Sequence, residues 1–221
     1  MQSIIYILLG TTDILVILLL IFKIFRWPFL TYIKELFFIA FICSIESYIA
    51  RMVMNIPQWD LILQVIILIF SLRYLLRVNY YHALTLTVIG TLAYSEIAYT
   101  VFNILNYIGI TTNNEASESI GFGVFATQIL SECMGIAVSW ILYKFNLGFS
   151  FVAVPPHDPK RTLSNYEQSK LIINFGCVLI VSTAMFWLMN YGMVGVNILM
   201  IGDFLALLVL LYLAQKEDYS F

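Results

Sequence analysis

Six ionisable side chains lie inside stretches of the sequence that are otherwise apolar, and they are the residues most able to do chemistry. An ionised side chain without a partner costs at least ~2.5–3.5 kcal/mol at the centre of a bilayer. Such residues therefore face the interior of a helix bundle, where they bind a ligand, carry protons or join helices. The candidate ligand-binding or polar-core residues are Asp13, Glu46, Arg51, Glu96, Glu132 and Asp203.

The depth of each residue follows from counting along its expected helix at about 1.5 Å per residue. Because no Lys or Arg shares the depth of the four acids nearest the midplane, these acids cannot all be ionised and close together. Some of them must be protonated or must hold a cation. The four lie roughly 13–15 Å from the cytoplasmic edge: Asp13, Glu46, Glu132 and Asp203.

The remaining two residues lie closer to the outer side. By the same count, Arg51 and Glu96 lie at equal depth, about one and a half helical turns further out than the midplane acids. They are predicted to form a buried ion pair between the second and fourth spans.

Three interpretations of the acids stay open. A protonated carboxyl can simply join helices by hydrogen bonding to nearby Ser, Asn or Gln side chains. Alternatively, the acids form a polar site that senses or binds a ligand, or a path for protons or cations. The polar neighbours available for the structural role are Ser44, Ser47, Ser95, Gln128, Ser131 and Asn197.

Composition indicates the elements that must position these residues. The chain of 221 residues is 62% hydrophobic and only 11% charged, whereas soluble domains have about 25% charged residues. Lipid must therefore solvate much of its surface. With a net charge of −2 and no basic patch, nucleic acid is not an expected partner. We expect an all-α polytopic bundle forming a single transmembrane domain over residues 1–221, located in the cell membrane.

About seven segments are long enough to cross the bilayer, which takes ~20 apolar residues. The third segment is short, and only residues 191–193 separate the last two, which are expected to form a tight helical hairpin. The N-terminus lacks the features of a signal peptide, so the first segment is expected to be a span. The segments are 4–22, 36–55, 61–76, 83–106, 120–143, 171–190 and 194–214.

The distribution of Lys and Arg sets the expected orientation. In an alternating arrangement of seven spans, ten of the eleven basic residues fall on one side and only Arg51 does not. Because basic residues favour the cytoplasmic side, the N-terminus is predicted outside and the C-terminus inside. The long inner segment 144–170 contains Pro155, Pro156 and Pro159, and is either a structured elbow or a stiff linker.

No catalytic, cofactor or metal constellation is expected. The last span has no lysine for a retinal Schiff base, and Met200-Ile201-Gly202-Asp203 lacks the first glycine of an aspartyl-protease motif. His82 and His157 are predicted to be interfacial or solvated. The three cysteines have no ligand spacing and are expected to pack within the membrane: Cys43, Cys133 and Cys177.

Three stretches together resemble a known family. They are Arg26-Trp27-Pro28 with Lys34-Glu35, Ser71-Leu72-Arg73-Tyr74-Leu75-Leu76-Arg77 with Tyr81-His82-Ala83, and Lys144-Phe145-Asn146-Leu147-Gly148-Phe149-Ser150-Phe151. With the span count, they resemble the N-terminal multi-span membrane sensor region of Agr-type (GHKL) histidine kinases of Gram-positive bacteria. The kinase core itself is not in this sequence. The chain is therefore expected to be either a stand-alone relative or a sensor region cut from a longer product.

The resemblance implies a non-enzymatic sensor or regulatory module for signal transduction in a two-component system. A small peptide or apolar molecule from outside would be its ligand. A histidine kinase, another membrane protein or a second copy in a homodimer would be its partner. Two alternatives are a small proton- or cation-coupled transporter that uses the midplane acids, and a structural subunit that stabilises another membrane protein.

Overall fold

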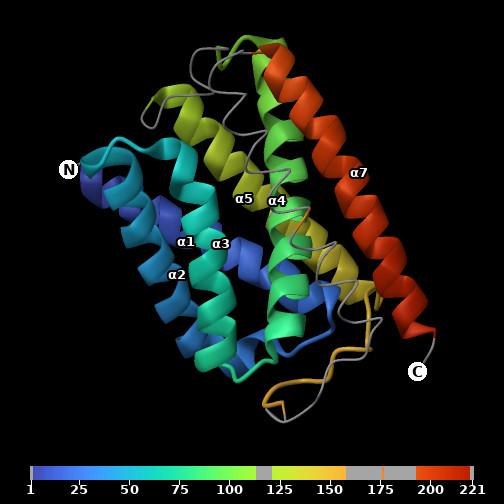
Figure 1. Ribbon diagram of the computed structural model, residues 1–221. Helices are drawn as coiled ribbons and strands as arrows, with labels where there is room; N and C mark the ends of the chain where they lie inside the picture. The colour runs from blue at the N-terminus through green and yellow to red at the C-terminus, as the bar shows by residue number, and fades with distance from the viewer. Residues whose placement is uncertain (1, 113–120, 158–175, 177–192, 220–221) are drawn as a thin grey trace.

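The computed structural model describes residues 2–112, 121–157, 176 and 193–219, and these residues are all-helical, without a strand (Figure 1). The predicted all-α fold is confirmed for this part of the chain. A 3-10 helix, η1, covers Phe29–Tyr32, and a π-helical turn, η2, covers Ile49–Val53. The long helices are α1 Gln2–Ile24, α2 Ile33–Tyr48, α3 Pro57–Tyr74, α4 Tyr80–Ile108, α5 Phe122–Lys144 and α7 Met193–Asp218.

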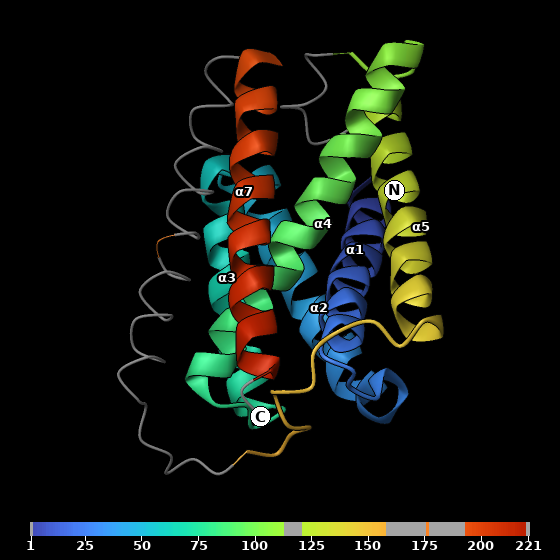
Figure 2. The same ribbon diagram turned by 90° about the vertical axis from the view of Figure 1, so that its right-hand side faces the viewer.

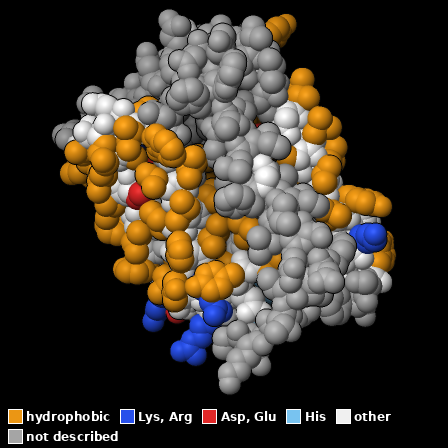
Figure 3. Space-filling model, in the orientation of Figure 1, with side chains coloured by type: hydrophobic (Ala, Val, Ile, Leu, Met, Phe, Trp, Pro, Cys, Tyr) orange, Lys and Arg blue, Asp and Glu red, His pale blue; other side chains and the backbone are white. Residues whose placement is uncertain are grey.

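Four helical segments are long and apolar enough to cross a membrane, which indicates an integral membrane protein. They are Ser3–Ile24, Phe29–Val53, Tyr80–Ile108 and Phe122–Lys144. Each coincides with a predicted span, and α3 and α7 coincide with two more. The predicted span 171–190 lies outside the described residues. Apolar side chains cover most of the described surface in Figure 3, as expected of helices that face lipid.

α3 begins earlier than the sequence predicted. The expected span started at residue 61, whereas the helix starts at Pro57 and has Asp60 in its first turn. Proline suits the first helical turn because its missing N–H would have no partner within the helix there. Asp60 is therefore part of a helix and is only 3% exposed, although the expected span began one residue after it.

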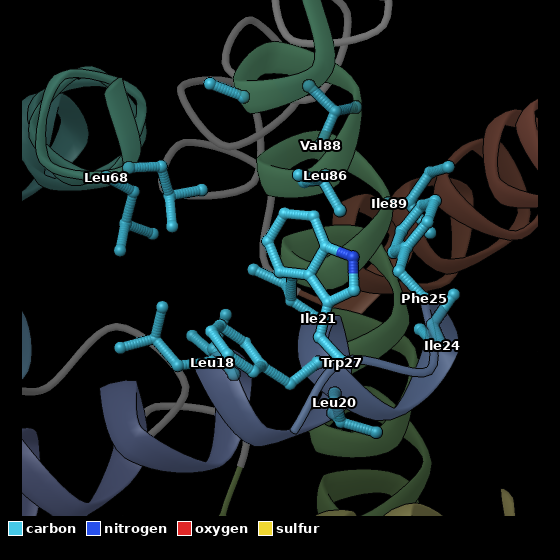
Figure 4. Packing of buried hydrophobic residues seen from close by; sticks show 14 of the residues in the cluster. Leu18, Leu20, Ile21, Ile24, Phe25, Trp27, Leu68, Leu86, Val88 and Ile89 are labelled. Atoms are coloured by element: carbon cyan, nitrogen blue, oxygen red, sulfur yellow. The ribbon is translucent and has the colours of Figure 1, made fainter. Parts of the chain in front are cut away.

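α1 and α4 form the centre of the bundle. α1 packs against α2, α4 and α5, and α4 packs against α1, α3, α5 and α7 (Figures 1 and 2). α1 is apolar around most of its circumference, as expected of a helix surrounded by other helices. Leu18, Ile21 and Phe22 on α1 are fully buried. Figure 4 shows the Trp27 indole, just beyond α1, packed close to α4.

One end of the bundle collects the basic residues, and we call it the basic end. It contains the C-terminal ends of α1, α3, α5 and α7 and the starts of α2 and α4 (Figure 2). Arg51 lies at the opposite end, in η2. Lys160, Arg161 and Lys170 are outside the described residues. The basic residues at this end are Lys23, Arg26, Lys34, Arg73, Arg77, Lys144 and Lys216.

Residues 145–157, which we call the elbow, form an ordered segment across the basic end. The Phe149 N–H donates to the Ile24 carbonyl at 2.7 Å. The Trp27 indole N–H donates to the Val152 carbonyl at 3.0 Å, and the Tyr32 hydroxyl donates to the Pro155 carbonyl at 2.8 Å. Of the two alternatives for this region, the structured elbow is confirmed over these residues.

The elbow also contacts the α3–α4 linker and the end of α7. The His157 N–H donates to the Arg77 carbonyl at 3.0 Å, and the Asn79 N–H donates to His157 Nδ1 at 3.2 Å. The backbone N–H and hydroxyl of Ser150 both donate to Asp218 Oδ1, at 2.7 and 2.9 Å. The elbow therefore joins the ends of three helices that are distant in the sequence.

Candidate functional site

The six candidate residues do not gather in one site. The structure distributes them over three polar groups between different helices. The Asp13–Glu132 group lies between α1, α4 and α5, the Arg51–Asp60 group between η2, α2 and α3, and the Glu96–Asp203 group between α4 and α7. The four acids predicted near the midplane are therefore divided among these groups, with Glu46 and Asp203 in different groups from Asp13 and Glu132.

In the Asp13–Glu132 group, polar side chains already satisfy both acids. The Tyr94 hydroxyl on α4 donates to Asp13 Oδ1, and Gln128 on α5 also interacts with the Asp13 carboxyl. The Thr12 hydroxyl lies 2.8 Å from Glu132 Oε1 and can donate to it. These contacts join three helices through protein groups alone. This group matches the structural interpretation, in which acids hold helices together.

This pairing leads to a first prediction. Tyr94→Phe should lower the free energy of unfolding by about 1–3 kcal/mol, because the partly buried Asp13 carboxyl loses the Tyr94 hydroxyl as a donor. Tyr99→Phe is the matched control on the same helix, since the buried Tyr99 hydroxyl has no partner among the described residues. It should cost nothing or stabilise slightly. Unfolding of the purified protein in detergent measures both, and equal effects would contradict the role given to Tyr94.

Arg51 pairs with Asp60, and the predicted pair of Arg51 with Glu96 is wrong. Arg51 Nε donates to Asp60 Oδ2 at 2.5 Å. The π-helical turn η2 and the early start of α3 at Pro57 bring the two side chains together across a short connection. The sequence contains a signal for this pair. Pro57 is suited to open a helix, and Asp60 in its first turn lies nine residues after Arg51.

Glu46 belongs to the same group but has no hydrogen bond. Both of its carboxylate oxygens are buried and have no hydrogen-bonding partner among the described residues. Its charge interacts with those of Asp60 and Arg51. Nearby, the Tyr6 hydroxyl on α1 and Ser47 Oγ on α2 are 3.0 Å apart. The group thus contains two acids and one base, and only one of the acids is paired.

The Glu96–Asp203 group contains polar atoms that no described residue satisfies. Asp203 is only 1% exposed and interacts electrostatically with Glu96 across the α4–α7 contact. Glu96 Oε1, the Tyr99 hydroxyl and Asp203 Oδ2 are all buried and have no hydrogen-bonding partner in the described part of the chain. Towards the opposite end from the basic end, Asn103 Nδ2 lies 3.4 Å from Met200 Sδ. Glu96, Tyr99 and Asn103 share one face of α4, because they are spaced by three and four residues.

Counting residues from the cytoplasmic helix ends places Asp203 at the midplane and Glu96 higher. Counting residues gives a height along each helix axis, but it ignores tilt and the offset between helices. The structure brings the two acids within electrostatic range of each other.

The Glu96–Asp203 group is the best candidate for a ligand site. Buried polar atoms are normally paired, so three unpartnered oxygen atoms in one place call for an explanation such as a bound group. Carboxyl and phenol oxygens in apolar surroundings can accept a proton, a cation or a hydrogen-bond donor of a ligand. Within the described ranges, no cluster of three or more His, Cys, Asp or Glu side chains is suited to a metal ion.

The two histidines lie together, which the sequence analysis missed. His82 is buried on α4, and its ring contacts that of His157 in the elbow, with centroids 5.5 Å apart. His157 also packs against Trp27, with ring centroids 6.2 Å apart. His82 is therefore not solvated, although it lies at the basic end of α4. Cys43 is buried as expected, Cys133 is exposed on the outside of α5, and Cys177 lies outside the described residues.

Comparison of this chain with models of known protein families, with curated proteins and with solved structures gives no match.

Proposed function

We propose that this protein is a non-enzymatic membrane sensor module in which α7 carries a change at the Glu96–Asp203 group to the basic end. One observation carries the proposal. In its middle α7 holds Asp203, whose buried Oδ2 has no hydrogen-bonding partner among the described residues, and at its end it binds the elbow through Asp218. A ligand that pairs with Asp203 would change how α7 packs on α4, and the elbow would respond at the other end of the helix.

The orientation of the sensor is part of the proposal. We infer seven spans with the N-terminus outside, because seven of the described basic residues lie at one end of the bundle and basic residues favour the cytoplasm. In this orientation the contact of Asn103 with Met200 lies on the outer side of the Glu96–Asp203 group, and α7 ends in the cytoplasm. The ligand would be a small peptide or apolar molecule with a hydrogen-bond donor or a positive charge.

The partner would be a signalling protein at the cytoplasmic end of α7. The resemblance to the sensor region of Agr-type histidine kinases suggests a kinase core, encoded in a longer product or a separate chain, and a homodimer. The physical argument is independent of that resemblance. A helix that is fastened at its end to the α1–α2 and α3–α4 linkers through the elbow can transmit a shift only by moving those contacts.

Replacing Glu96 and Asp203 by their amides tests this proposal, because the amides remove the charges that a bound ligand would otherwise compensate. Spin labels at positions 145 and 219, in the elbow and at the end of α7, would report the distance between these segments in nanodiscs. We expect Glu96→Gln with Asp203→Asn to shift this distance distribution by about 2–5 Å, the scale of helix shifts in signalling proteins. Glu35→Gln, at the exposed start of α2, is the control. An unchanged distribution in the double variant would exclude transmission through α7.

A second candidate function is a small proton- or cation-coupled carrier. The observation that favours it is the set of buried carboxyl oxygens that have no partner among the described residues, on Glu46, Glu96 and Asp203. Intramembrane acids of this kind often form ion pathways. Purified protein in liposomes should then show proton or sodium flux that is lost in Asp203→Asn and kept in Glu35→Gln. Liposomes that stay tight with the wild-type protein would exclude the carrier.

A further inference from the structure

Three basic side chains gather where α1 and α5 end at the basic end. Lys23 Nζ lies 4.5 Å from the centre of the Tyr143 ring, and Lys144 Nζ lies 4.7 Å from the centre of the Trp140 ring. Arg26 Nη2 donates to the Asn146 carbonyl at 2.9 Å, at the start of the elbow. The three cations therefore surround residues 140–146, and we call them the α1–α5 basic cluster.

No acid neutralises this cluster within the part of the chain that the structure describes. The one ion pair there joins Arg51 to Asp60, at the opposite end of the bundle. Asp218, the acid that contacts the elbow, accepts two hydrogen bonds from Ser150. Three uncompensated positive charges in one place repel one another, so an anion bound between them would be stabilised.

The surface next to the cluster is apolar and aromatic. Trp140 and Tyr143 are 57% and 69% exposed, and Phe145 and Leu147 of the elbow are also exposed. From there, exposed apolar side chains continue along α5, including Ile141 and Met134. Tryptophan and tyrosine favour the level of the lipid headgroups, which places the cluster at the membrane–water boundary. Positive charge at that level, above an apolar helix face, complements a molecule with an anionic head and hydrocarbon chains.

We propose that the α1–α5 basic cluster binds the headgroup of an anionic phospholipid, whose acyl chains lie along the apolar face of α5. Lys23 and Lys144 would contact the phosphate as point charges, and the Arg26 guanidinium would donate to its oxygens. Basic sites between membrane helices bind anionic lipid headgroups in this way. Since Arg26 already contacts the elbow, the bound lipid would also hold the elbow against α1. This inference does not depend on the proposed sensor function.

Quenching of Trp140 fluorescence by brominated lipid tests the proposal with the full chain in vesicles. Trp59→Phe and Trp187→Phe leave Trp140 and the buried Trp27 as the reporters. Dibrominated phosphatidylglycerol is titrated against phosphatidylcholine, which gives the relative binding constant of the anionic lipid. We expect a preference of at least about fivefold for phosphatidylglycerol, the factor that one basic residue near an anionic surface supplies.

The variants distinguish this site from the general charge of the basic end. The preference should fall to about one when Lys23, Arg26 and Lys144 are all replaced by Gln. The matched control replaces Lys34, Arg77 and Lys216 by Gln, which removes the same charge from the same end, and should keep the preference. Because the Arg26 variant could disturb the elbow, Lys144→Gln alone is measured as well and should lower the preference at least about twofold. Equal losses in both triple variants, or no preference in the wild type, would overturn the proposal.

A soluble competitor distinguishes a lipid from a free phosphate. Millimolar glycerol 3-phosphate should leave the quenching by brominated phosphatidylglycerol unchanged, because it lacks the acyl chains that the α5 face would bind. Competition by glycerol 3-phosphate would show a site for soluble phosphate and would overturn the lipid assignment.

Discussion

Replacing Gly148 by alanine should lower the free energy of unfolding by about 2–4 kcal/mol. Gly148 lies in the elbow with a φ of +127°, a backbone conformation that residues with a side chain rarely adopt. A Cβ atom there would lie 2.5 Å from the Ile24 carbonyl oxygen and 3.0 Å from that of Lys23. Both are backbone atoms at the end of α1, so relieving the clash requires the elbow to move. The hydrogen bond from Phe149 to Ile24 would be lost with it.

Two other glycines distinguish the backbone strain at Gly148 from the clash of a Cβ atom with α1. Gly109 also has a positive φ, of +83°, but a Cβ atom there would meet nothing within 4 Å. Gly109→Ala should therefore cost only the backbone strain, about 1 kcal/mol. Gly202 lies within α7 and likewise has open space, so Gly202→Ala should be neutral or stabilise by up to about 1 kcal/mol. Thermal unfolding in detergent gives the order, and equal losses at Gly148 and Gly109 would contradict the close contact with α1.

The positions of the helices could be predicted from the sequence because the bilayer imposes them. In lipid every backbone polar group needs an internal partner, so an apolar stretch of sufficient length must form a helix. The predicted spans therefore coincide with α1, the continuous segment η1–α2–η2, α4 and α5, which are long and apolar enough to span a membrane. The start of α3 was missed because the expected span began at residue 61, with the apolar stretch, whereas Pro57 opens the helix.

The pairing of polar residues could not be predicted in the same way. Counting residues along a helix gives a depth, but it does not give the direction in which a side chain points or the tilt of its helix. Arg51 was therefore assigned to Glu96, a residue of similar depth, instead of Asp60 across a tight connection. The contact of Tyr94 with Asp13 joins residues 81 positions apart and depends on how α4 packs on α1. Such contacts follow from the tertiary fold and not from any single segment.

The contacts of the elbow could not be predicted from the sequence for a related reason. Its prolines allowed either a stiff linker or a structured segment, because proline restricts the backbone without defining what it contacts. The order of the elbow comes from partners on the α1–α2 and α3–α4 linkers, such as Trp27 and Asn79, and at the end of α7.

The second large effect is expected at the Arg51–Asp60 pair. Asp60→Asn should lower the free energy of unfolding by about 2–3 kcal/mol, because it leaves the Arg51 charge without its partner. The loss is smaller than the 3–5 kcal/mol typical of fully buried pairs, since the Arg51 side chain is 34% exposed. Glu46 can partly replace the missing carboxylate, because its charge already interacts with that of Arg51. Adding Glu46→Gln to Asp60→Asn should therefore destabilise by more than the sum of the two single effects.

A pair of double-mutant cycles measured by unfolding in detergent would decide which acid Arg51 depends on. Arg51→Gln combined with Asp60→Asn should show a coupling energy of about 1–3 kcal/mol, as expected for residues in one ion pair. Arg51→Gln combined with Glu96→Gln should be additive within about 0.5 kcal/mol, because Glu96 belongs to the group around Asp203. The opposite result, with strong coupling to Glu96 and none to Asp60, would restore the pairing expected from depth alone. It would also mean that α2 and α4 approach each other near Arg51, which would move Glu96 away from the proposed sensor site on α7.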